Sequence, residues 1–295
     1  MDTYIGIDVG KTKVAAGLVS PKGKVLRRSV HLRKEMKDSQ DVLAHCVDAA
    51  SEMIHHSSSR PKGIGIGTLG IVDPFSGSIL YSSVWRGFNI SSFFRNKLGI
   101  RTFAANDVRA AALGEHLFGA SRGCRLSVYL TISSGVAFCT IEDGRIINGS
   151  HLIAGQLGPM MVHEDGSRIE SRFSGMGIRD MASRGRSASI ETKDVFKRGY
   201  GSRNRYSKII EDAVHSAAAA IAIIQSTVDP ELIVVGGSVA NNQHRFISEA
   251  KAKAEKMMGN YMVQFPKGIN LVHSKLGADA GIIGAAALAM PRRRT

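Results

Sequence analysis

The residues best suited to chemistry in this sequence lie where predicted strands end in turns. Asp8 follows an apolar stretch and precedes a turn that contains Gly10, Lys11, Thr12 and Lys13. On a tight hairpin of this kind, backbone N–H groups and a hydroxyl can face phosphate oxygens, and a nearby carboxylate attracts a hydrated cation. The stretch therefore predicts a phosphate site with a cation beside Asp8.

A second hairpin repeats the arrangement. Ser133, Ser134 and Gly135 occupy the same place between two later predicted strands. Two such hairpins that face each other across a cleft could clamp the phosphates of one nucleotide. The alternative is that both are ordinary hairpins with common turn residues.

Two other phosphate-like patterns lack the context that they need. GKT at residues 10–12 has isoleucine where a P-loop requires its first glycine, and a strand follows it instead of a helix. Gly65, Gly67 and Gly70 satisfy GxGxxG, but the next residues contain a proline and another glycine rather than a helix. We reject both nucleotide-binding interpretations.

The pair Asn106 and Asp107 is the candidate for acid–base chemistry. The two residues end an apolar strand and begin a helix. Their side chains are expected to project from the carboxyl end of the strand, which is where open α/β sheets bind ligands. The alternative for Asp107 is a purely structural role as a helix N-cap.

A duplicated series of elements must position these residues. Two successive βββαβα units imply an α/β fold of two similarly built lobes with a cleft between them, and small-molecule sites favour such interfaces. Ser39 is the expected cap of the first helix. Periodicity and turn signals predict strands at 4–10, 12–20, 23–33, 62–70, 100–107, 125–134, 135–143, 144–152, 231–237 and 269–274, and helices at 39–56, 90–98, 108–119, 206–228, 245–258 and 279–290.

One of the two predicted lobes is formed by two separate segments of the chain. A hinge near residues 116–124 separates them, and the apolar helix at the end of the chain must be covered somewhere. Packing of that helix on the first lobe gives a first domain of residues 1–118 plus 276–295 and a second domain of residues 119–275. The first domain is therefore expected to be discontinuous.

Composition narrows the class of protein. With 295 residues and 43% apolar content, the chain can form two ordinary cores. The start lacks the basic and apolar regions of a signal peptide, and we expect a cytoplasmic protein without a membrane segment. Three scattered cysteines give neither a disulfide framework nor a metal-ligand spacing. The formal charge of +14 is spread along the chain rather than gathered in one stripe, which argues against a nucleic-acid partner.

An ordered series of motifs over nearly the whole chain resembles the ROK family of sugar kinases and repressors in the actin/hexokinase superfamily. The matching pieces are IGIDVGKTKVAAGLV, GIGIGTLGIVDPFSG, ANDVRAAALGE, VYLTISSGVAFCTIEDGRIINGS, AGQLGPMMV, IESRFSG, DPELIVVGGSVA and LGADAGIIGAAALA. The resemblance implies two actin-like (ribonuclease H-like) lobes and, as is usual in the family, a homodimer or higher homo-oligomer.

The resemblance also implies roles for particular residues. Asp107 would be the catalytic base for a sugar hydroxyl that attacks the γ-phosphate of ATP. Asp8 would position Mg²⁺ through water, and Lys11 would add a phosphate contact in place of a glycine common in the family. Both hairpins would bind the ATP phosphates, Gly236 and Gly237 would lie near the adenosine, and Asn106 and Glu170 would bind sugar hydroxyls. Gly70, Arg86 and Gln156 are further candidates for substrate binding in this sequence.

Departures from the family pattern lie in its zinc site and sugar site. Gln156, Leu157, Gly158 and Pro159 stand where the family usually has Glu-x-Gly-His, and HEDGSRIES replaces a Cys-x-Cys cluster. Since all four usual zinc ligands are missing, no structural zinc is expected. Val84 stands where sugar kinases of the family often have an asparagine, so hexose recognition is partly altered.

The same departures suggest an anionic acceptor. Gln156 removes a carboxylate, and Arg86, Arg109 and Arg172 lie in segments expected to approach the sugar. A buried carboxylate beside a substrate carboxylate is unfavourable, so this exchange favours a sugar acid such as 2-keto-3-deoxygluconate, a substrate of archaeal members of the family. The alternatives are a neutral hexose or N-acetylhexosamine, such as glucose or N-acetylmannosamine, with the arginines on a basic surface.

Two non-kinase classes are the alternatives to this activity. Repressors of the family carry a helix-turn-helix before the first hairpin, and here that hairpin begins at Tyr4, so DNA binding is not expected. A sugar-binding protein without catalysis is the closer rival, because several sugar-site positions have changed. Against it, the chain keeps the residues that phosphoryl transfer needs, which are Asp8, Thr12, Asn106, Asp107 and Glu170.

Overall fold

The computed structural model describes residues 2–161, 163–185, 189–265 and 267–291. The chain folds into two compact units. Unit 1 contains residues 1–123, 144–154 and 278–295, and unit 2 contains residues 124–143 and 155–277. The main difference from the predicted domains is the segment 144–154, which the sequence pattern assigns to the second domain and which belongs to unit 1.

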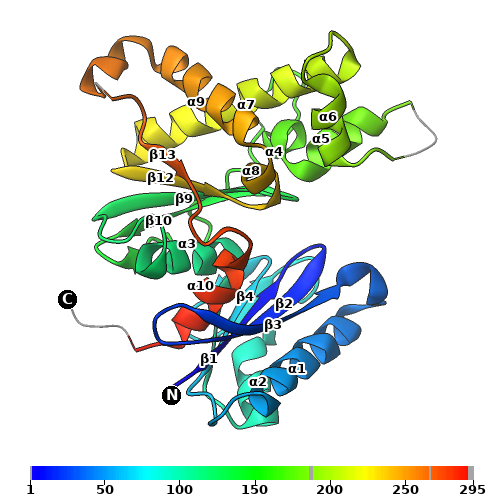
Figure 1. Ribbon diagram of the computed structural model, residues 1–295, viewed down its shortest axis with the longest axis vertical. Coiled ribbons are helices and arrows are strands. Elements are labelled where there is room, and N and C mark those ends of the chain that lie inside the picture. Colours follow the sequence, from blue (N-terminus) through cyan, green and yellow to red (C-terminus); the bar gives the residue numbers. More distant parts are fainter. Residues whose placement is uncertain (1, 162, 186–188, 266, 292–295) are drawn as a thin grey trace. The chain divides into compact units, whose positions relative to one another are not determined.

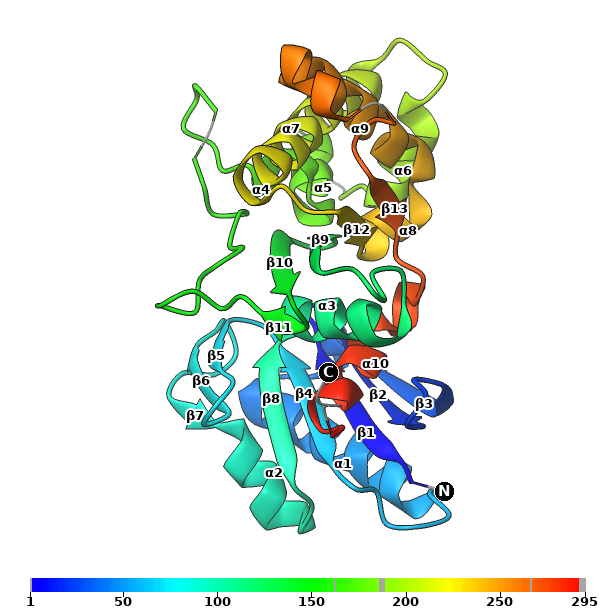
Figure 2. The ribbon, with the colours of Figure 1, turned by 90° about the vertical axis from the view of Figure 1, so that its left-hand side faces the viewer.

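Unit 1 is built on a five-stranded sheet with the order β3-β2-β1-β4-β8. The first three strands are antiparallel, and β4 and β8 run parallel to β1. In Figures 1 and 2, α1 and α2 lie on one face of this sheet, and α3 and α10 lie on the other. The elements are β1 (Tyr4–Val9), β2 (Lys13–Val19), β3 (Val25–Leu32), η1 (Arg33–Glu35), α1 (Ser39–His55), β4 (Ile64–Thr68), α2 (Ile90–Leu98), β8 (Thr102–Asn106), α3 (Asp107–Phe118), η3 (Gly277–Asp279) and α10 (Ala280–Leu288).

Alternation along β1 assigns its side chains to the two faces. Ile5 and Ile7 belong to the core that α1 completes with Cys46, whereas Tyr4 clusters with Ile282 of α10. Asp8 has the same parity as Tyr4, so it lies on the α10 face of the sheet. The strand pattern therefore decides which helix approaches the candidate carboxylate.

The N-cap of helix α1 lies one residue before the predicted cap residue. Asp38, rather than Ser39, is the N-cap residue, and its side chain accepts hydrogen bonds from the N–H groups of Gln40 and Asp41 at 2.8 and 2.9 Å. Ser39 is the first residue of the helix. Both residue types are good caps, and only the backbone dihedrals of the folded chain select between them.

A small three-stranded sheet occupies a region for which the sequence predicts only a loop. The strands β5 (Ile71–Asp73), β6 (Ser78–Tyr81) and β7 (Phe88–Asn89) have the order β5-β6-β7. Strands of two to four residues give too little alternation for a sequence pattern to detect. This sheet carries the turn from Ser82 to Trp85, and Arg86 follows it.

Unit 2 repeats the plan with a sheet in which β10, β9, β12 and β13 are neighbours in this order. Figure 1 shows its helices gathered on one side of the sheet. The elements are β9 (Leu126–Ile132), β10 (Val136–Glu142), α4 (Glu170–Phe173), α5 (Gly175–Ser183), α6 (Thr192–Gly199), α7 (Arg205–Val228), β12 (Leu232–Gly236), α8 (Ser238–Asn242), α9 (His244–Met258), η2 (Gly259–Gln264) and β13 (Leu271–His273). The short strand β11 (Arg145–Ile146) follows β10 in the chain but lies within the 144–154 segment of unit 1. The predicted third strand of this unit, 144–152, is only two residues long, because the chain after Ile146 leaves the sheet.

Helix α7 is the one described helix that is long and apolar enough to cross a membrane by length and composition. Its buried residues, among them Ile210, Ala217 and Ile224, belong to the main core of unit 2. The helix packs against α6 and α9. We therefore assign α7 as the central core helix of unit 2.

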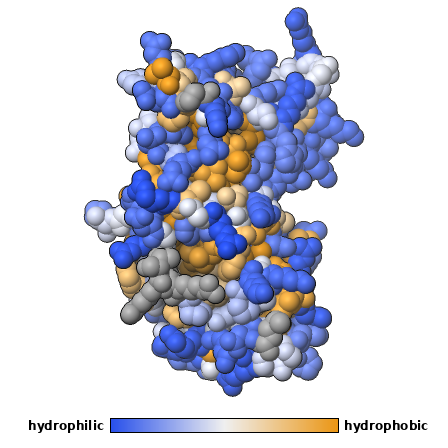
Figure 3. Space-filling model, turned by 60° about the vertical axis from the view of Figure 1, so that its left-hand side comes forward, coloured by the Kyte–Doolittle hydropathy of each residue, from blue (hydrophilic) through white to orange (hydrophobic). Residues whose placement is uncertain are grey.

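One face of the molecule is mainly hydrophilic. Figure 3 shows a face on which hydrophilic residues prevail and apolar residues form smaller areas between them. Among the described residues, Cys46 and Cys139 are buried, Cys124 is half-buried, and all three are free thiols. The basic end of the chain at 292–295 lies outside the described residues.

Candidate active site

The carboxyl ends of the parallel strands in unit 1 bring the candidate carboxylates together. Asp8 of β1 pairs in register with Gly67 of β4, and Gly67 pairs with Ala105 of β8. One residue further along, Thr68 pairs with Asn106. Gly67 leaves room in the middle strand, since a Cβ there would lie 3.2 Å from Ala110 and 3.5 Å from the Cα of Asp107.

Asp8 and Asp107 interact electrostatically. Burial, followed by the charge of Asp107, raises the pKa of Asp8 to about 7, and the charge of Lys13 opposes the shift. Burial also raises the pKa of Asp107, against hydrogen bonds from the backbone and the charge of Lys11. Two half-buried carboxyl groups with raised pKa values at one strand edge are a typical feature of a functional site.

Asn106, not Asp107, is the N-cap residue of α3. Its Oδ1 accepts from the N–H groups of Val108 and Arg109 at 3.1 and 3.3 Å, and its Nδ2 donates to the carbonyl of Gly70 at 3.0 Å. Asp107 is the first helical residue, and its Oδ1 accepts from the Val108 N–H at 3.0 Å. The structural alternative for Asp107 is thus corrected, because its neighbour performs the capping.

The first hairpin places two polar side chains in solvent. The Gly10 N–H donates to the Lys13 carbonyl at 2.9 Å and closes the turn between β1 and β2. Lys11 and Thr12 at the tip are exposed. The tip is therefore open to a ligand, while Lys13 at the base of β2 lies within electrostatic reach of Asp8.

The GxGxxG glycines are explained by packing and turn geometry. A Cβ at Gly65 would collide with the backbone of Ala285 in α10, and Gly70 adopts a φ of +100°. No helix starts after Gly70, since β5 follows at Ile71. This arrangement agrees with the rejection of a dinucleotide-binding motif.

In unit 2, the second hairpin contacts the residues that follow β12 and α4. The Gly175 N–H donates to the Ser133 carbonyl at 2.6 Å, and the Ser133 and Ser238 hydroxyls are 3.1 Å apart. A Cβ at Gly237 would lie 2.6 Å from the Ile132 carbonyl, and its φ of +95° favours glycine. Ser133 and Gly237 therefore come together, as a nucleotide site in this unit would require.

Packing against a neighbouring side chain explains why residue 236 is glycine. A Cβ at this position would meet the ring of Tyr129 on the neighbouring strand β9. The GG pair alone is therefore weak evidence for a nucleotide. Ser238, which sequence reasoning missed, directly follows this pair and has the closer contact with the hairpin.

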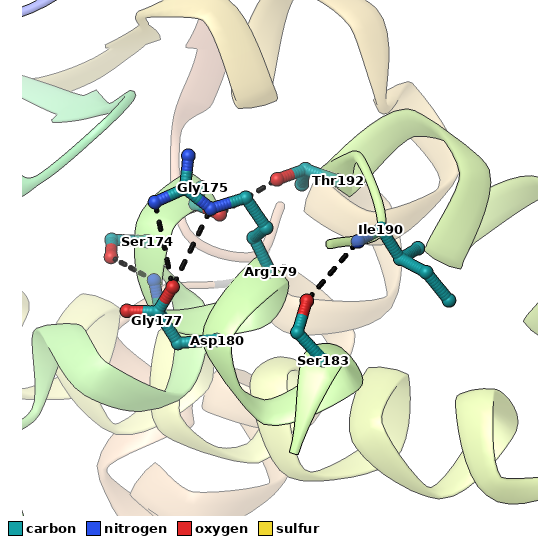
Figure 4. Close-up of polar contacts among 8 residues, drawn as sticks. All are labelled: Ser174, Gly175, Gly177, Arg179, Asp180, Ser183, Ile190 and Thr192. Atoms are coloured by element: carbon teal, nitrogen blue, oxygen red, sulfur yellow. Dashed lines mark hydrogen bonds and ion pairs between the residues drawn. The ribbon is translucent and has the colours of Figure 1, made fainter. Parts of the chain in front are cut away.

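The start of α5 is fixed by side-chain hydrogen bonds, which Figure 4 shows. The Gly177 N–H donates to the Ser174 hydroxyl at 3.0 Å, and the Thr192 hydroxyl donates to the Gly175 carbonyl at 2.6 Å. Because Gly175 also contacts Ser133, these bonds brace the hairpin. They connect the hairpin to the junction between α4, which begins at Glu170, and α5.

The stretch around Gln156 lies along β10 and against Glu170. The Phe138 N–H donates to the Gly155 carbonyl at 2.9 Å, and the Glu170 N–H donates to the Gly158 carbonyl at 3.3 Å. A Cβ at Gly158 would lie 2.7 Å from Oε2 of Glu170. Unit 2 thus brings Gln156 and Glu170 into one neighbourhood, and Gly158 leaves the space that the glutamate occupies.

Two of the three arginines expected near an anionic acceptor, Arg109 and Arg172, already have protein partners. Arg172 forms an ion pair with Asp165 and donates to the Ser167 hydroxyl at 3.2 Å. Arg109 is buried, and its Nη2 donates to the carbonyls of Asn148 and Leu152 at 3.2 and 2.8 Å.

The third arginine, Arg86, is exposed, with its guanidinium 6.0 Å from the centre of the Tyr81 ring. Two of the three charges are therefore engaged by protein groups. The electrostatic argument for a sugar acid loses most of its basis, because sequence position showed the charges but not their partners.

The loop at the family's zinc position is closed by backbone contacts. Met161 and Arg168 form an antiparallel β-bridge. A cavity of about 320 Å³ next to it is lined by His163, Glu164, Asp165, Arg172, Asp212, His215 and Ser216. Among the described residues, no group of three or more His, Cys, Asp or Glu side chains is arranged to hold a metal ion.

Comparison with known proteins defines the class to which this fold belongs. The ROK family model matches residues 4–292. A crystal structure of a ROK hexokinase from Thermus thermophilus superposes with a TM-score of 0.80 and 26% identity, over 97% of each chain. The mixed α/β fold predicted from the sequence is thereby confirmed.

Two relatives extend the similarity over the whole chain. An N-acetylmannosamine kinase from Escherichia coli O157:H7 is 27% identical over 97% of this chain and 98% of its own. The bifunctional enzyme NanE/NanK of Brucella melitensis is 33% identical over 97% of this chain and 53% of its own, so the chain spans about half of that relative. The chain belongs to the ROK family.

Proposed function

We propose that this chain is an ATP-dependent carbohydrate kinase whose acceptor is a neutral hexose or an N-acetylhexosamine. The observation that carries the proposal is the pair of half-buried carboxyl groups with raised pKa values, Asp8 and Asp107, at the carboxyl edge of β1 and β8. Membership of the ROK family supports the phosphoryl-transfer class.

Asp107 is the proposed catalytic base. As the acceptor hydroxyl attacks the γ-phosphorus of ATP, its proton passes to the Asp107 carboxylate, and the bond between the γ-phosphorus and the β,γ-bridging oxygen breaks, which leaves ADP. The raised pKa makes Asp107 a better proton acceptor than an exposed aspartate. The Val108 N–H bond at 3.0 Å orients the carboxylate.

The two hairpins are the proposed phosphate contacts, with Thr12, Lys11 and Lys13 on one and Ser133 to Gly135 on the other. Asp8 suits Mg²⁺, which usually keeps several waters and needs only one or two carboxylates beside the phosphates. A bound cation would also favour the ionised form of Asp8, whose pKa is raised to about 7 without one. Mg²⁺ would offset negative charge on the transferred group.

The acceptor class follows from the arrangement of charges. Gln156 is neutral, Glu170 lies against the 156–158 stretch, and Arg109 and Arg172 are occupied by carbonyls and by Asp165. The carboxylate of an anionic acceptor would lie near Glu170, while these two arginines are engaged elsewhere. The similarity to an N-acetylmannosamine kinase and a ROK hexokinase supports a neutral acceptor and does not support 2-keto-3-deoxygluconate.

The test is a panel of acceptors with coupled detection of ADP. We expect glucose, mannose, N-acetylglucosamine or N-acetylmannosamine to exceed 2-keto-3-deoxygluconate in kcat/KM by roughly tenfold or more. Asp107→Asn should lower kcat by about 10² to 10⁴ with nucleotide binding retained. Faster turnover of the sugar acid would refute the acceptor class.

The non-catalytic rival makes a different prediction. If no sugar is turned over and Asp107→Asn changes neither sugar nor nucleotide affinity, the protein is a sugar-binding relative without kinase activity. Isothermal titration with each sugar and with the ATP analogue AMPPNP provides both affinities.

A further inference from the structure

We propose that Gly281, at the start of α10, is a positioning residue for Asp8. The absence of a side chain at Gly281 creates the space that the Asp8 carboxyl group occupies. This inference rests on the proposed function for its kinetic consequence, but the contact itself can be tested without any activity.

Strand and helix geometry bring the two residues together from opposite ends of the chain. Asp8 lies on the α10 face of β1, one pleat beyond Gly6. A Cβ at Gly6 would collide with the backbone of Ile282 and lie 2.8 Å from the N atom of Ala286. The strand and the helix are therefore in close backbone contact, and Asp8 meets the first turn of α10.

The distances at Gly281 show what a larger residue would meet. A Cβ built on Gly281 would lie 2.6 Å from Cγ and 3.2 Å from Cβ of Asp8, and closer still to Oδ2. The three nearest atoms all belong to this one side chain. A methyl group at Gly281 would thus displace the Asp8 carboxyl group specifically.

Backbone conformation gives no other reason for glycine here. Gly281 is the second residue of a regular helix and does not adopt a positive φ. In a helix, alanine is normally more favourable than glycine. The helix would therefore be more stable with alanine if Asp8 did not occupy the space.

Displacement of Asp8 would affect one part of the proposed reaction. Asp8 is the proposed Mg²⁺ carboxylate, whereas the acceptor residues Asn106, Gln156 and Glu170 are not among the groups that a Cβ at Gly281 would meet first. The predicted defect is therefore a higher Mg²⁺ requirement and a lower kcat, with the acceptor KM unchanged.

A double-mutant cycle tests the contact. We expect Gly281→Ala to lower the midpoint of thermal unfolding in the wild-type background and to raise it in the Asp8→Ala background, where the space is free. Equal shifts in both backgrounds would overturn the proposal. Because only unfolding is measured, this result stands whether or not the kinase assignment is correct.

Kinetics test the positioning role. We expect Gly281→Ala to reduce kcat roughly tenfold or more and to raise the Mg²⁺ concentration for half-maximal rate about threefold or more, with the acceptor KM within about twofold of wild type. Wild-type kcat and Mg²⁺ dependence in a folded Gly281→Ala variant would overturn the role. Absence of turnover in the wild-type protein, with coupling still present in the cycle, would overturn the proposed function and leave only the structural contact.

Discussion

At the level of single residues, the candidate site is defined by what each polar group touches. Asp8 and Asp107 share one strand edge, and burial raises the pKa of both. Asn106 uses its side chain for the cap of α3 and for the Gly70 carbonyl. The proposed catalytic residue Asp107 and the cap residue Asn106 are therefore adjacent in the sequence but differ in their contacts.

The raised pKa of Asp8 has a consequence for stability. Between the ordinary value of 3.8 and about 7, the folded protein binds more protons at Asp8 than the unfolded chain does. Stability from this group is thus present at low pH and is lost as the pH rises through about 7. Without Mg²⁺, ionised Asp8 is a destabilising charge at a half-buried position.

We therefore predict that Asp8→Asn stabilises the protein at about pH 8 in the absence of Mg²⁺, by on the order of 1 to 4 kcal/mol. The gain should shrink as the pH approaches about 4.5, where Asp8 is protonated in the folded protein. Urea unfolding at both pH values measures it. Asp2→Asn is the control, because Asp2 is exposed. A gain that is the same at both pH values would contradict the assigned burial of Asp8.

At the level of elements, the segment 144–154 shows how a buried charge can organise a loop. The segment follows β10 of the second sheet yet belongs to unit 1. Arg109 of α3 donates to the carbonyls of Asn148 and Leu152, and the Ala154 N–H donates to the Asn148 carbonyl at 3.3 Å. Leu152 adopts a φ of +60°, which the surrounding contacts must maintain.

Replacement of Arg109 by alanine should lower the free energy of unfolding by about 1 to 3 kcal/mol, since two charge-assisted hydrogen bonds are lost. It should also make the loop between Ile147 and Ile153 more sensitive to limited proteolysis. The exposed Arg86→Ala provides the control and should stay within about 0.5 kcal/mol of wild type. Equal protease resistance of wild type and Arg109→Ala would show that the loop is held by other contacts.

For the molecule as a whole, unit 1 is completed only by the end of the chain. Helix α10 packs on α3, β1 and β4, and Ile282, Ile283 and Ala286 in it are buried. The close approach of α10 to the sheet depends on Gly6 and Gly65. The last segment is thus part of the first core rather than an appendage.

Removal of residues 278–295 should therefore leave unit 1 unable to fold, because a layer of its core is missing. We expect the shortened chain to lose its cooperative thermal transition or to aggregate. A synthetic peptide of residues 278–291, added in trans, should restore part of the transition, whereas a scrambled peptide should not. A shortened chain with wild-type stability would show that α10 is dispensable.

The order and type of most elements could be predicted from the sequence, whereas the roles of the candidate site residues stay predictions. Strong periodicity made β1, α1, α3 and α7 predictable, because their apolar faces repeat over several turns or pleats. The sequence also identified Asp8, Asn106 and Asp107, since each stands at the end of an apolar strand before a turn or helix.

Only the tertiary structure shows which polar groups already have partners. The sequence showed Arg109 and Arg172 as positive charges, but it could not show that carbonyls and Asp165 engage them. The sequence likewise left open a ligand-binding role for Gly236, although the Tyr129 ring on the neighbouring strand β9 occupies the space where a side chain at residue 236 would lie. Contacts between residues distant in sequence depend on packing and not on local pattern. For that reason the sequence predicted the mixed α/β fold correctly, but its electrostatic argument for a sugar acid counted arginines that already have protein partners.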